Sequence, residues 1–167
     1  MKPAADAPAL RVQAILGPRF TVVAFEDSTR TSADAAAAIG CTVAQIAKSV
    51  IFRTARDNKP VLVVASGSNR IDDRKVAAAI GEKVKSADAD YVLANTGFVI
   101  GGVPPVGHAV PPITLLDPDL KQHQVIWAAG GTPHSVFSLT WDDLVSLTQG
   151  KAADVAKATL PDQAARP

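Results

Sequence analysis

Cysteine, aromatic residues and long apolar runs are all scarce in this chain. The single cysteine, Cys41, excludes an internal disulfide and a zinc site built on cysteine pairs. No apolar run approaches the ~18 residues that suggest a membrane-spanning helix. The N-terminal Met-Lys-Pro-Ala-Ala-Asp also lacks the apolar region of a signal peptide. We therefore expect a cytoplasmic protein that has no contact with a membrane.

An excess of charge of one sign is also lacking. Lysine and arginine total 17 and the acidic residues 16, which gives a net charge of +1. This balance predicts no tight independent binding of nucleic acid, although a local patch suffices for phosphate contacts. The chain has no HExxH motif, no close Asp/His cluster, no GxGxxG or Walker motif and no GxSxG elbow. We therefore expect neither a metal nor a cofactor.

The residues that are present describe a globular protein. The chain has 167 residues, of which 47% are hydrophobic, chiefly Ala, Val, Ile and Leu. This length is enough for one domain with a real core. We predict a single domain over residues 1–150. Residues 151–167 turn to Ala, Lys, Asp and Pro, which favours a weakly ordered tail.

Hydrophobic periodicity and helix start and stop signals predict short helices between strands. The predicted helices cover residues 8–17, 31–39, 42–48, 72–80, 86–94 and 140–147. The predicted strands cover residues 19–25, 49–53, 61–65, 83–85, 113–116, 125–129 and 134–139. The helices are too irregularly spaced for repeated βαβ units. A mixed α/β fold, with a curved, largely antiparallel sheet or barrel-like core and short peripheral helices, fits better.

A segment rich in glycine and proline covers residues 95–108. It holds four of the 11 glycines and two of the 12 prolines, Pro104 and Pro105. The prolines lack backbone donors, and the Gly101-Gly102 step leaves N–H groups uncovered. Such groups can bind an anion or a developing oxyanion. A tight connection between two strands would have the same composition. Both interpretations stay open at this point.

Lys48 lies where a helical pattern gives way to an apolar strand pattern. A fixed ammonium there could meet a phosphate or a carbonyl, and a surface lysine at a helix C-terminus is the simpler alternative. His134 follows a second Gly-Gly turn at residues 130–133. It is either part of a site or a half-buried histidine at the start of a strand. Neither position supplies an evident nucleophile. The inventory suits a substrate with its own proton relay, such as an aminoacyl ester beside a ribose hydroxyl.

Several segments together resemble one known family. They are Thr31 to Gly40, Gln45-Ile46-Ala47-Lys48-Ser49, Pro60 to Val64, Gly81 to Val84, Thr96 to Gly107, Asp117 before Leu120, Ala129 to His134, and Thr140 with Leu144. In this order they resemble the YbaK/EbsC proteins, the free-standing relatives of the editing domain of bacterial prolyl-tRNA synthetase. The resemblance covers roughly residues 10–150.

The resemblance implies a trans-editing aminoacyl-tRNA deacylase. Such an enzyme would act on tRNA-Pro that carries Ala, Cys, Ser, Thr or 2-aminobutyrate. Its partners would be the aminoacyl-tRNA 3′ end and possible helpers, prolyl-tRNA synthetase or an elongation factor. Alanine-specific members often have an Asn after the lysine. Ser49 stands there in this chain, which argues against alanine specificity.

The resemblance also implies which residues form the site. Lys48 matches the essential lysine, and Gly101 and Pro105 match the ends of the loop that holds the aminoacyl carbonyl. The implied catalytic residues are Lys48, Gly101 and Gly102. The implied substrate-binding residues are Ser49, Val103, Pro104, Pro105, Thr132 and His134. A non-catalytic module that binds an aminoacyl or nucleotide group beside a synthetase remains the alternative.

Overall fold

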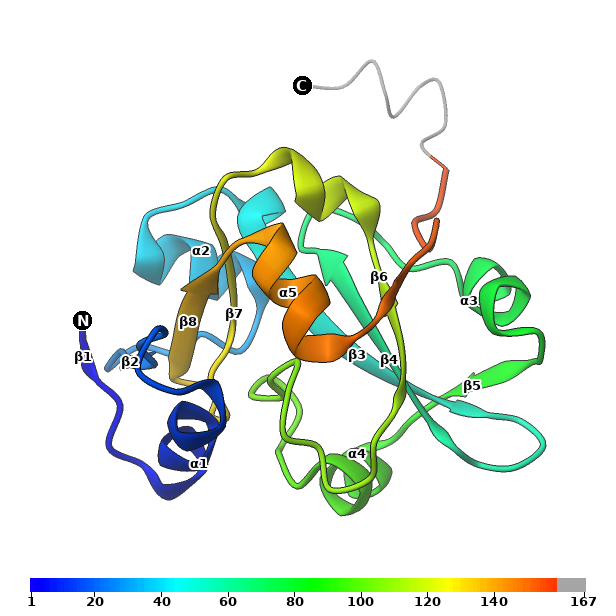
Figure 1. Cartoon of the computed structure of the whole chain (residues 1–167), viewed down its shortest axis with the longest axis horizontal. Helices are drawn as coiled ribbons and strands as arrows, with labels where there is room; N and C mark the ends of the chain where they lie inside the picture. The colour runs from blue at the N-terminus through cyan, green and yellow to red at the C-terminus, as the bar shows by residue number, and fades with distance from the viewer. Residues whose placement is uncertain (159–167) are drawn as a thin grey trace.

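Nine short strands form one open sheet in the computed structural model, which describes residues 1–158 (Figure 1). The strand order is β1-β2-β8-β7-β3-β4-β6-β9, and β5 is a further neighbour of β3. The strands are β1 (Lys2–Pro3), β2 (Val23–Ala24), β3 (Ile46–Thr54), β4 (Pro60–Ser66), β5 (Val84–Ser86), β6 (Ile113–Leu116), β7 (Ile126–Ala129), β8 (Ser135–Leu139) and β9 (Lys151–Ala152).

The predicted mixed α/β class is confirmed, with two changes. The sheet does not close, so the barrel-like alternative is wrong. Five strand pairs are antiparallel, whereas the pairs β3–β7, β4–β6 and β6–β9 are parallel. The antiparallel β3–β4 hairpin lies at the centre, as the sequence predicted.

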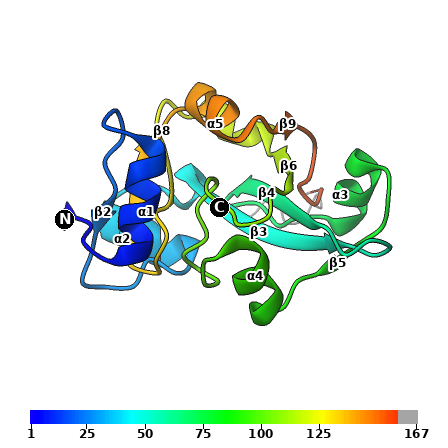
Figure 2. The same ribbon diagram turned by 60° about the horizontal axis from the view of Figure 1, so that its bottom comes forward.

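Five short helices and two 3-10 turns connect the strands. They are α1 (Ala7–Leu16), α2 (Ser32–Ile39), α3 (Asp73–Ile80), α4 (Ala89–Thr96), α5 (Trp141–Thr148) and the 3-10 turns Val43–Gln45 and Pro118–Gln122. Helices α1 and α2 lie near β8 at one end of the sheet, and α3 lies near β5 at the other end (Figures 1 and 2). None of the helices in residues 1–158 is long and apolar enough to cross a membrane.

Side-chain caps decide where several of these helices begin. Thr31 accepts a hydrogen bond from the Asp34 N–H at the start of α2, and Thr140 accepts one from the Asp143 N–H at the start of α5. The helix predicted from Ser86 begins three residues later. Its cap is Asp88, because Ser86 is the last residue of β5.

Two further element predictions were wrong for physical reasons. The strand predicted at residues 19–25 shortens to β2, because Phe20 and Val22 are buried in the core cluster that includes Val12 and Leu16 of α1. The helix predicted at residues 42–48 is a single 3-10 turn. Thr42 and Gln45 close that turn as a capping box, and β3 begins at the buried Ile46.

The central strand β4 is buried along its whole length because both faces of the hairpin are covered. Leu62 and Val64 belong to the cluster that includes Val92 of α4 and Leu144 of α5. The alternate residues, Val61, Val63 and Ala65, belong to a second cluster that includes Val76 of α3 and Val155. This two-sided burial fixes the position of the neighbouring strand β3.

The prediction of a weakly ordered tail from residue 151 was wrong for the part that the structure describes. Strand β9 pairs in parallel with β6, and the side chain of Val155 is completely buried. Ala156 forms a bridge with Ile71, and the Lys157 N–H donates to the Arg70 carbonyl. The apolar Val155 thus anchors a segment whose composition looks polar. Residues 159–167 of the predicted tail lie outside the described residues.

Candidate active site

A pocket opens where β3 separates from β7. The two strands pair only at Ile46–Trp127 and Ala47–Ala128. Strand β5 joins β3 from Phe52 onward. Between these two contacts, none of the strands within residues 1–158 pairs with β3 on the edge away from β4. The separation of the strands therefore leaves an opening beside Lys48, Ser49 and Val50.

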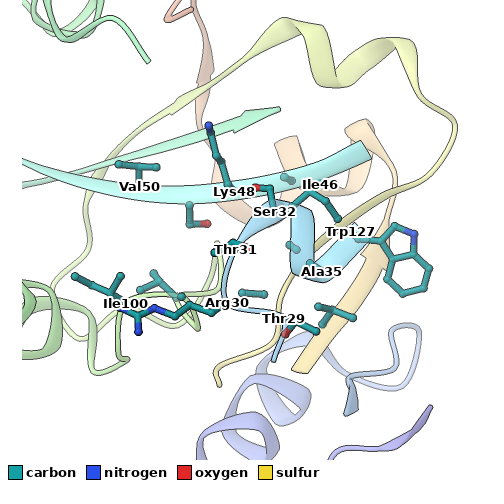
Figure 3. Close-up of a pocket in the computed structure, with 17 residues that line it drawn as sticks. Thr29, Arg30, Thr31, Ser32, Ala35, Ile46, Lys48, Val50, Ile100 and Trp127 are labelled. Carbon is teal, nitrogen blue, oxygen red and sulfur yellow. The ribbon is translucent and has the colours of Figure 1, made fainter. Parts of the chain in front are cut away.

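The pocket has a volume of about 350 Å³. Its walls come from β3, β7 and β8, from the N-terminal turn of α2 with the preceding Thr29 and Arg30, and from the Gly/Pro loop. Most of the lining side chains are small or aliphatic, among them Ala35, Ala47, Ala128, Ala129 and Val136. Figure 3 shows the labelled residues of α2 and β3 on facing walls. The space suits a small organic group held among apolar walls.

Lys48 is the third residue of β3 and not the end of a helix, so the simpler interpretation of this lysine was wrong. Its side chain lines the pocket, and its ammonium donates a hydrogen bond to the Asn69 carbonyl. Burial lowers the pKa of Lys48, the Asp117 carboxylate opposes that shift, and Arg70 adds to it. In Figure 3 the ammonium extends away from Arg30 and Ile100.

Asp117 organises the loop that holds this ammonium. The carboxylate is 2% exposed. It accepts hydrogen bonds from the Ser66 N–H at 3.1 Å, from Asn69 Nδ2 at 2.8 Å and from the Asp119 N–H at 2.9 Å. Asn69 therefore links a buried carboxylate, through its side chain, to Lys48, through its carbonyl.

The Gly/Pro loop brings Gly101 to the pocket. Gly101 has φ +88°, a conformation that L side chains rarely adopt, and its Cα lies against the stem of Arg30. The Gly101 N–H has no acceptor among residues 1–158. The Gly102 N–H, in contrast, donates to the Val99 carbonyl at 3.0 Å. Gly101 alone of this pair therefore has a free donor, which corrects the prediction that both N–H groups are uncovered.

The structure brings four of the predicted site residues into the pocket lining: Lys48, Ser49, Gly101 and Val103. The other five, Gly102, Pro104, Pro105, Thr132 and His134, lie behind the lining or away from it. A Cβ at Gly102 would lie 2.7 Å from the carbonyl carbon of Thr132. This close approach shows that Gly102 seats the loop on the second Gly-Gly turn.

That second turn supports the pocket from outside. Thr132 is buried and its Oγ1 lies 2.8 Å from Ser135 Oγ. His134 is exposed, and its Nδ1 lies 3.1 Å from the Asp27 carbonyl. Between them, the Pro133 carbonyl accepts a hydrogen bond of 2.6 Å from the Thr29 N–H. The turn therefore holds the segment that carries Arg30.

The sequence did not reveal Arg30 or Trp127 as lining residues. Arg30 precedes α2, and its stem packs on Gly101 while its side chain extends toward Ile100 (Figure 3). Neither Arg30 nor Lys48 takes part in the two ion pairs found within residues 1–158. The one available signal was the Thr31 cap, which places the start of α2 but not the direction of Arg30. Two cations at the pocket thus lie outside these ion pairs, and Lys48 keeps its hydrogen bond to the Asn69 carbonyl.

The described residues contain no group of three or more His, Cys, Asp or Glu side chains that could hold a metal ion. The pocket itself offers a lysine, an arginine, small hydroxyl groups and the free Gly101 N–H. Such groups can position an ester and stabilise an oxyanion.

Comparisons with known proteins agree with this geometry. The family model for the aminoacyl-tRNA editing domain matches residues 26–147. YwhH of Bacillus subtilis, an uncharacterized protein, is 38% identical over 137 residues, which cover 81% of this chain and 87% of that protein. EbsC of Enterococcus faecalis, named as a Cys-tRNA(Pro)/Cys-tRNA(Cys) deacylase, is 30% identical over 115 residues, or 66% of this chain and 70% of EbsC.

A solved structure extends the match to the fold. A protein described as a trans-editing enzyme for prolyl-tRNA synthetase superposes with a TM-score of 0.87 at 39% identity, covering 93% of this chain and all of that one. The matched segment contains Lys48, the Gly/Pro loop and the whole pocket lining. The chain therefore belongs to the aminoacyl-tRNA editing domain family and is an aminoacyl-tRNA hydrolase.

Proposed function

We propose that the protein is a trans-editing deacylase for mischarged tRNA-Pro. Its substrates would carry a small non-cognate amino acid, namely Ala, Cys, Ser, Thr or 2-aminobutyrate. The observation that carries this proposal is the 350 Å³ pocket, in which a free Gly101 N–H and two cations that join neither ion pair of residues 1–158 meet small apolar walls. An aminoacyl ester on a terminal nucleotide has the complementary parts: a carbonyl, a phosphate and a short side chain.

The Gly101 N–H would stabilise the oxyanion that develops at the ester carbonyl. One such donor is worth about 3 kcal/mol of transition-state stabilisation in comparable sites. The pocket lining contains no Cys, His, Asp or Glu that could act as nucleophile or strong base. The proton would therefore pass through the vicinal ribose hydroxyl or a bound water. The chain's own task is to position the ester and to stabilise the charge that forms on it.

Lys48 and Arg30 would hold the terminal nucleotide. Both carry a positive charge at the pocket, and both have donors to spare for a phosphate oxygen or a carbonyl. The Asn69 carbonyl occupies only one of the three ammonium hydrogens of Lys48. Arg30 reaches the opening from the other side, next to Gly101.

Selection of the amino acid would depend mainly on size. The walls near the strand separation are alanine and valine side chains, so an added methylene meets packed atoms. One methylene is worth about 1–3 kcal/mol in such a pocket. A panel of esters should therefore show a graded response, with the prolyl ester excluded by its ring.

The decisive experiment is a deacylation panel with purified protein. tRNA-Pro would be charged with Ala, Cys, Ser, Thr, 2-aminobutyrate or Pro, and the loss of the ester would be measured for the wild type and for Lys48→Ala. We expect hydrolysis of at least one small non-cognate ester, sparing of the prolyl ester, and loss of activity in Lys48→Ala with an unchanged circular dichroism spectrum. Saturable binding of every ester without turnover would instead support a binding module.

The same panel can test whether a partner delivers the substrate. The net charge of +1 gives little general attraction to tRNA. Adding prolyl-tRNA synthetase or an elongation factor should then raise the rate at low tRNA concentration and leave the saturated rate unchanged.

A further inference from the structure

The edge of β3 that faces the pocket carries main-chain groups without a strand partner. Alternate residues of an antiparallel strand direct their N–H and C=O groups to opposite edges. The Ile46 carbonyl accepts from the Gly67 N–H at 2.8 Å, and the Thr54 N–H donates to the Lys59 carbonyl at 2.9 Å. The main-chain N–H and C=O groups of the even-numbered residues of β3 therefore point toward β4. Ser49 is odd-numbered, so its N–H and C=O face the opposite edge.

That opposite edge is open at Ser49. Strand β7 pairs with Ile46 and Ala47 only, and β5 begins its pairing at Phe52. The side-chain Oγ of Ser49 is also buried and has no hydrogen-bond partner within residues 1–158. A buried hydroxyl group without a partner is uncommon and costly. Three polar groups of one pocket-lining residue are thus left for a ligand.

We infer that the main-chain N–H and C=O of Ser49 bind the aminoacyl group through two hydrogen bonds, as two facing residues of an antiparallel strand pair bind each other. In an antiparallel pair, two facing residues exchange both of their N–H···O=C bonds. The aminoacyl group has the same pattern, because its α-ammonium is a donor and its ester carbonyl an acceptor. The Ser49 carbonyl accepts from the α-ammonium, and the Ser49 N–H donates to the ester carbonyl. This inference rests on the proposed function and adds the recognition element for the amino acid.

The pairing explains how one site accepts several amino acids. Main-chain pairing recognises the atoms that all aminoacyl esters share, whereas the side chain points out of the plane of the pair. The class of ligand is therefore an aminoacyl group with a free α-ammonium in an extended conformation. An N-acylated group would lose this contact.

Amide exchange followed by NMR tests the inference on the wild-type protein. The probe is 3′-deoxy-3′-(L-alanylamino)adenosine, in which an amide replaces the ester that would be hydrolysed. We expect the Ser49 amide to exchange freely without the probe and about tenfold more slowly with it, as one added hydrogen bond implies. The Val50 amide is the matched control, because it faces β4 and should be protected in both states.

The outcomes separate the inference from the proposed function. Probe-induced chemical-shift changes of the Lys48 and Gly101 amides, without slower exchange of the Ser49 amide, would refute the pairing and leave the proposed function intact. A Ser49 amide that is already protected without the probe would also refute the pairing. No shift anywhere in the pocket would contradict both.

A pair of variants supplies an independent measurement. Ser49→Ala removes the hydroxyl, and Ser49→Pro removes the hydroxyl and the N–H. Proline is tolerated where a strand N–H faces away from its partner. We expect kcat/KM of Ser49→Pro to lie about tenfold below that of Ser49→Ala, the size of one hydrogen bond. Equal values in two folded variants would overturn the inference. If Ser49→Pro does not fold, the exchange measurement on the wild type decides.

Discussion

Asp117 is the residue on which the position of the Lys48 ammonium depends. Removing its carboxylate leaves the Ser66 N–H and the Asp119 N–H without their acceptor, and it leaves Asn69 Nδ2 with Asp119 as its remaining acceptor. We expect Asp117→Ala to lower the free energy of unfolding by about 2–4 kcal/mol, because the Asp117 side chain and its hydrogen bond from the Ser66 N–H are buried. It should also lower kcat/KM, since the Asn69 carbonyl no longer holds Lys48.

Urea unfolding and deacylation kinetics measure the two effects. Asp119→Ala is the matched control, because the exposed Asp119 accepts a side-chain hydrogen bond from Asn69 alone. Asp119→Ala should lower the free energy of unfolding by less than about 1 kcal/mol. If both variants lost the same stability and the same activity, Asp117 would have no special part in placing the lysine.

Alanine substitutions at Gly101 and Gly97 can distinguish the effect of filling space at the pocket from the effect of backbone strain. Both have positive φ, at +88° and +84°, so an alanine at either position should cost about 1 kcal/mol of stability. A Cβ at Gly101 would collide with Arg30, whereas nothing lies within 4 Å of one at Gly97. We expect Gly101→Ala to lose activity and Gly97→Ala to lose stability only. Equal activity of the two variants in the deacylation panel would contradict a role of Gly101 in the site.

At this scale the sequence was a good guide to the residues with unusual chemistry. Lys48 and Gly101 stood out by residue type and by resemblance, and both line the pocket. Arg30 did not stand out, because nothing in an isolated Asp-Ser-Thr-Arg-Thr segment shows that its stem will pack on a glycine 71 positions later. The hydrogen bond from the Gly102 N–H to the Val99 carbonyl was not predicted either, because composition does not show which N–H groups a turn will pair.

At the scale of elements, the C-terminal segment offers a clear test. Val155 is completely buried against the cluster that contains Val61 and Val76. Val155→Ala should lower the free energy of unfolding by about 2 kcal/mol, because a buried side chain loses two methyl groups. Thermal or urea unfolding measures this change. The neighbouring Asp154→Ala is the control, since Asp154 is exposed, forms a surface pair with Lys75 and accepts one exposed hydrogen bond from the Ala156 N–H.

A wild-type stability for Val155→Ala would show that the segment from residue 151 does not contribute to the core. The sequence did not predict this segment, because β9 has only two residues and two residues show no periodicity. The same limit applies to the pocket edge of β3. A pattern of apolar residues predicted a strand in the region of β3. It did not predict that the pairing of β3 with β7 would end after two residue pairs. Long-range pairing decided both features.

For the whole molecule, a half-buried histidine, His108, links stability to pH. Burial lowers the pKa of His108, whose Nε2 lies 2.6 Å from the Pro104 carbonyl and whose Nδ1 has no partner within residues 1–158. The folded protein therefore protonates His108 less readily than the unfolded chain, which takes up a proton near pH 6.5. The stability from this group is complete above about pH 6.5 and falls with pH below it, by at most about 1.4 kcal/mol per pH unit.

His108→Gln should flatten this dependence. Glutamine can donate to the Pro104 carbonyl but cannot take up a proton in this range. Unfolding curves between pH 5 and 7.5 for the wild type and the variant give the difference, and the exposed His134→Gln accounts for loss of a histidine as such. Parallel stability curves for wild type and His108→Gln would show that the loop tolerates a charged His108.

The separation of β3 from β7 also has a consequence for biosynthesis. Strand β3 leaves the ribosome as part of a local hairpin with β4, but Ile46 and Ala47 on its other edge have no strand partner until Trp127 and Ala128 follow about 80 residues later. Until then Ile46 and Ala47, which are buried in the finished protein, have no cover on that side. The pocket therefore cannot exist before Val136 has been translated. A nascent chain halted earlier would expose an apolar strand edge, and a chaperone would act on it there.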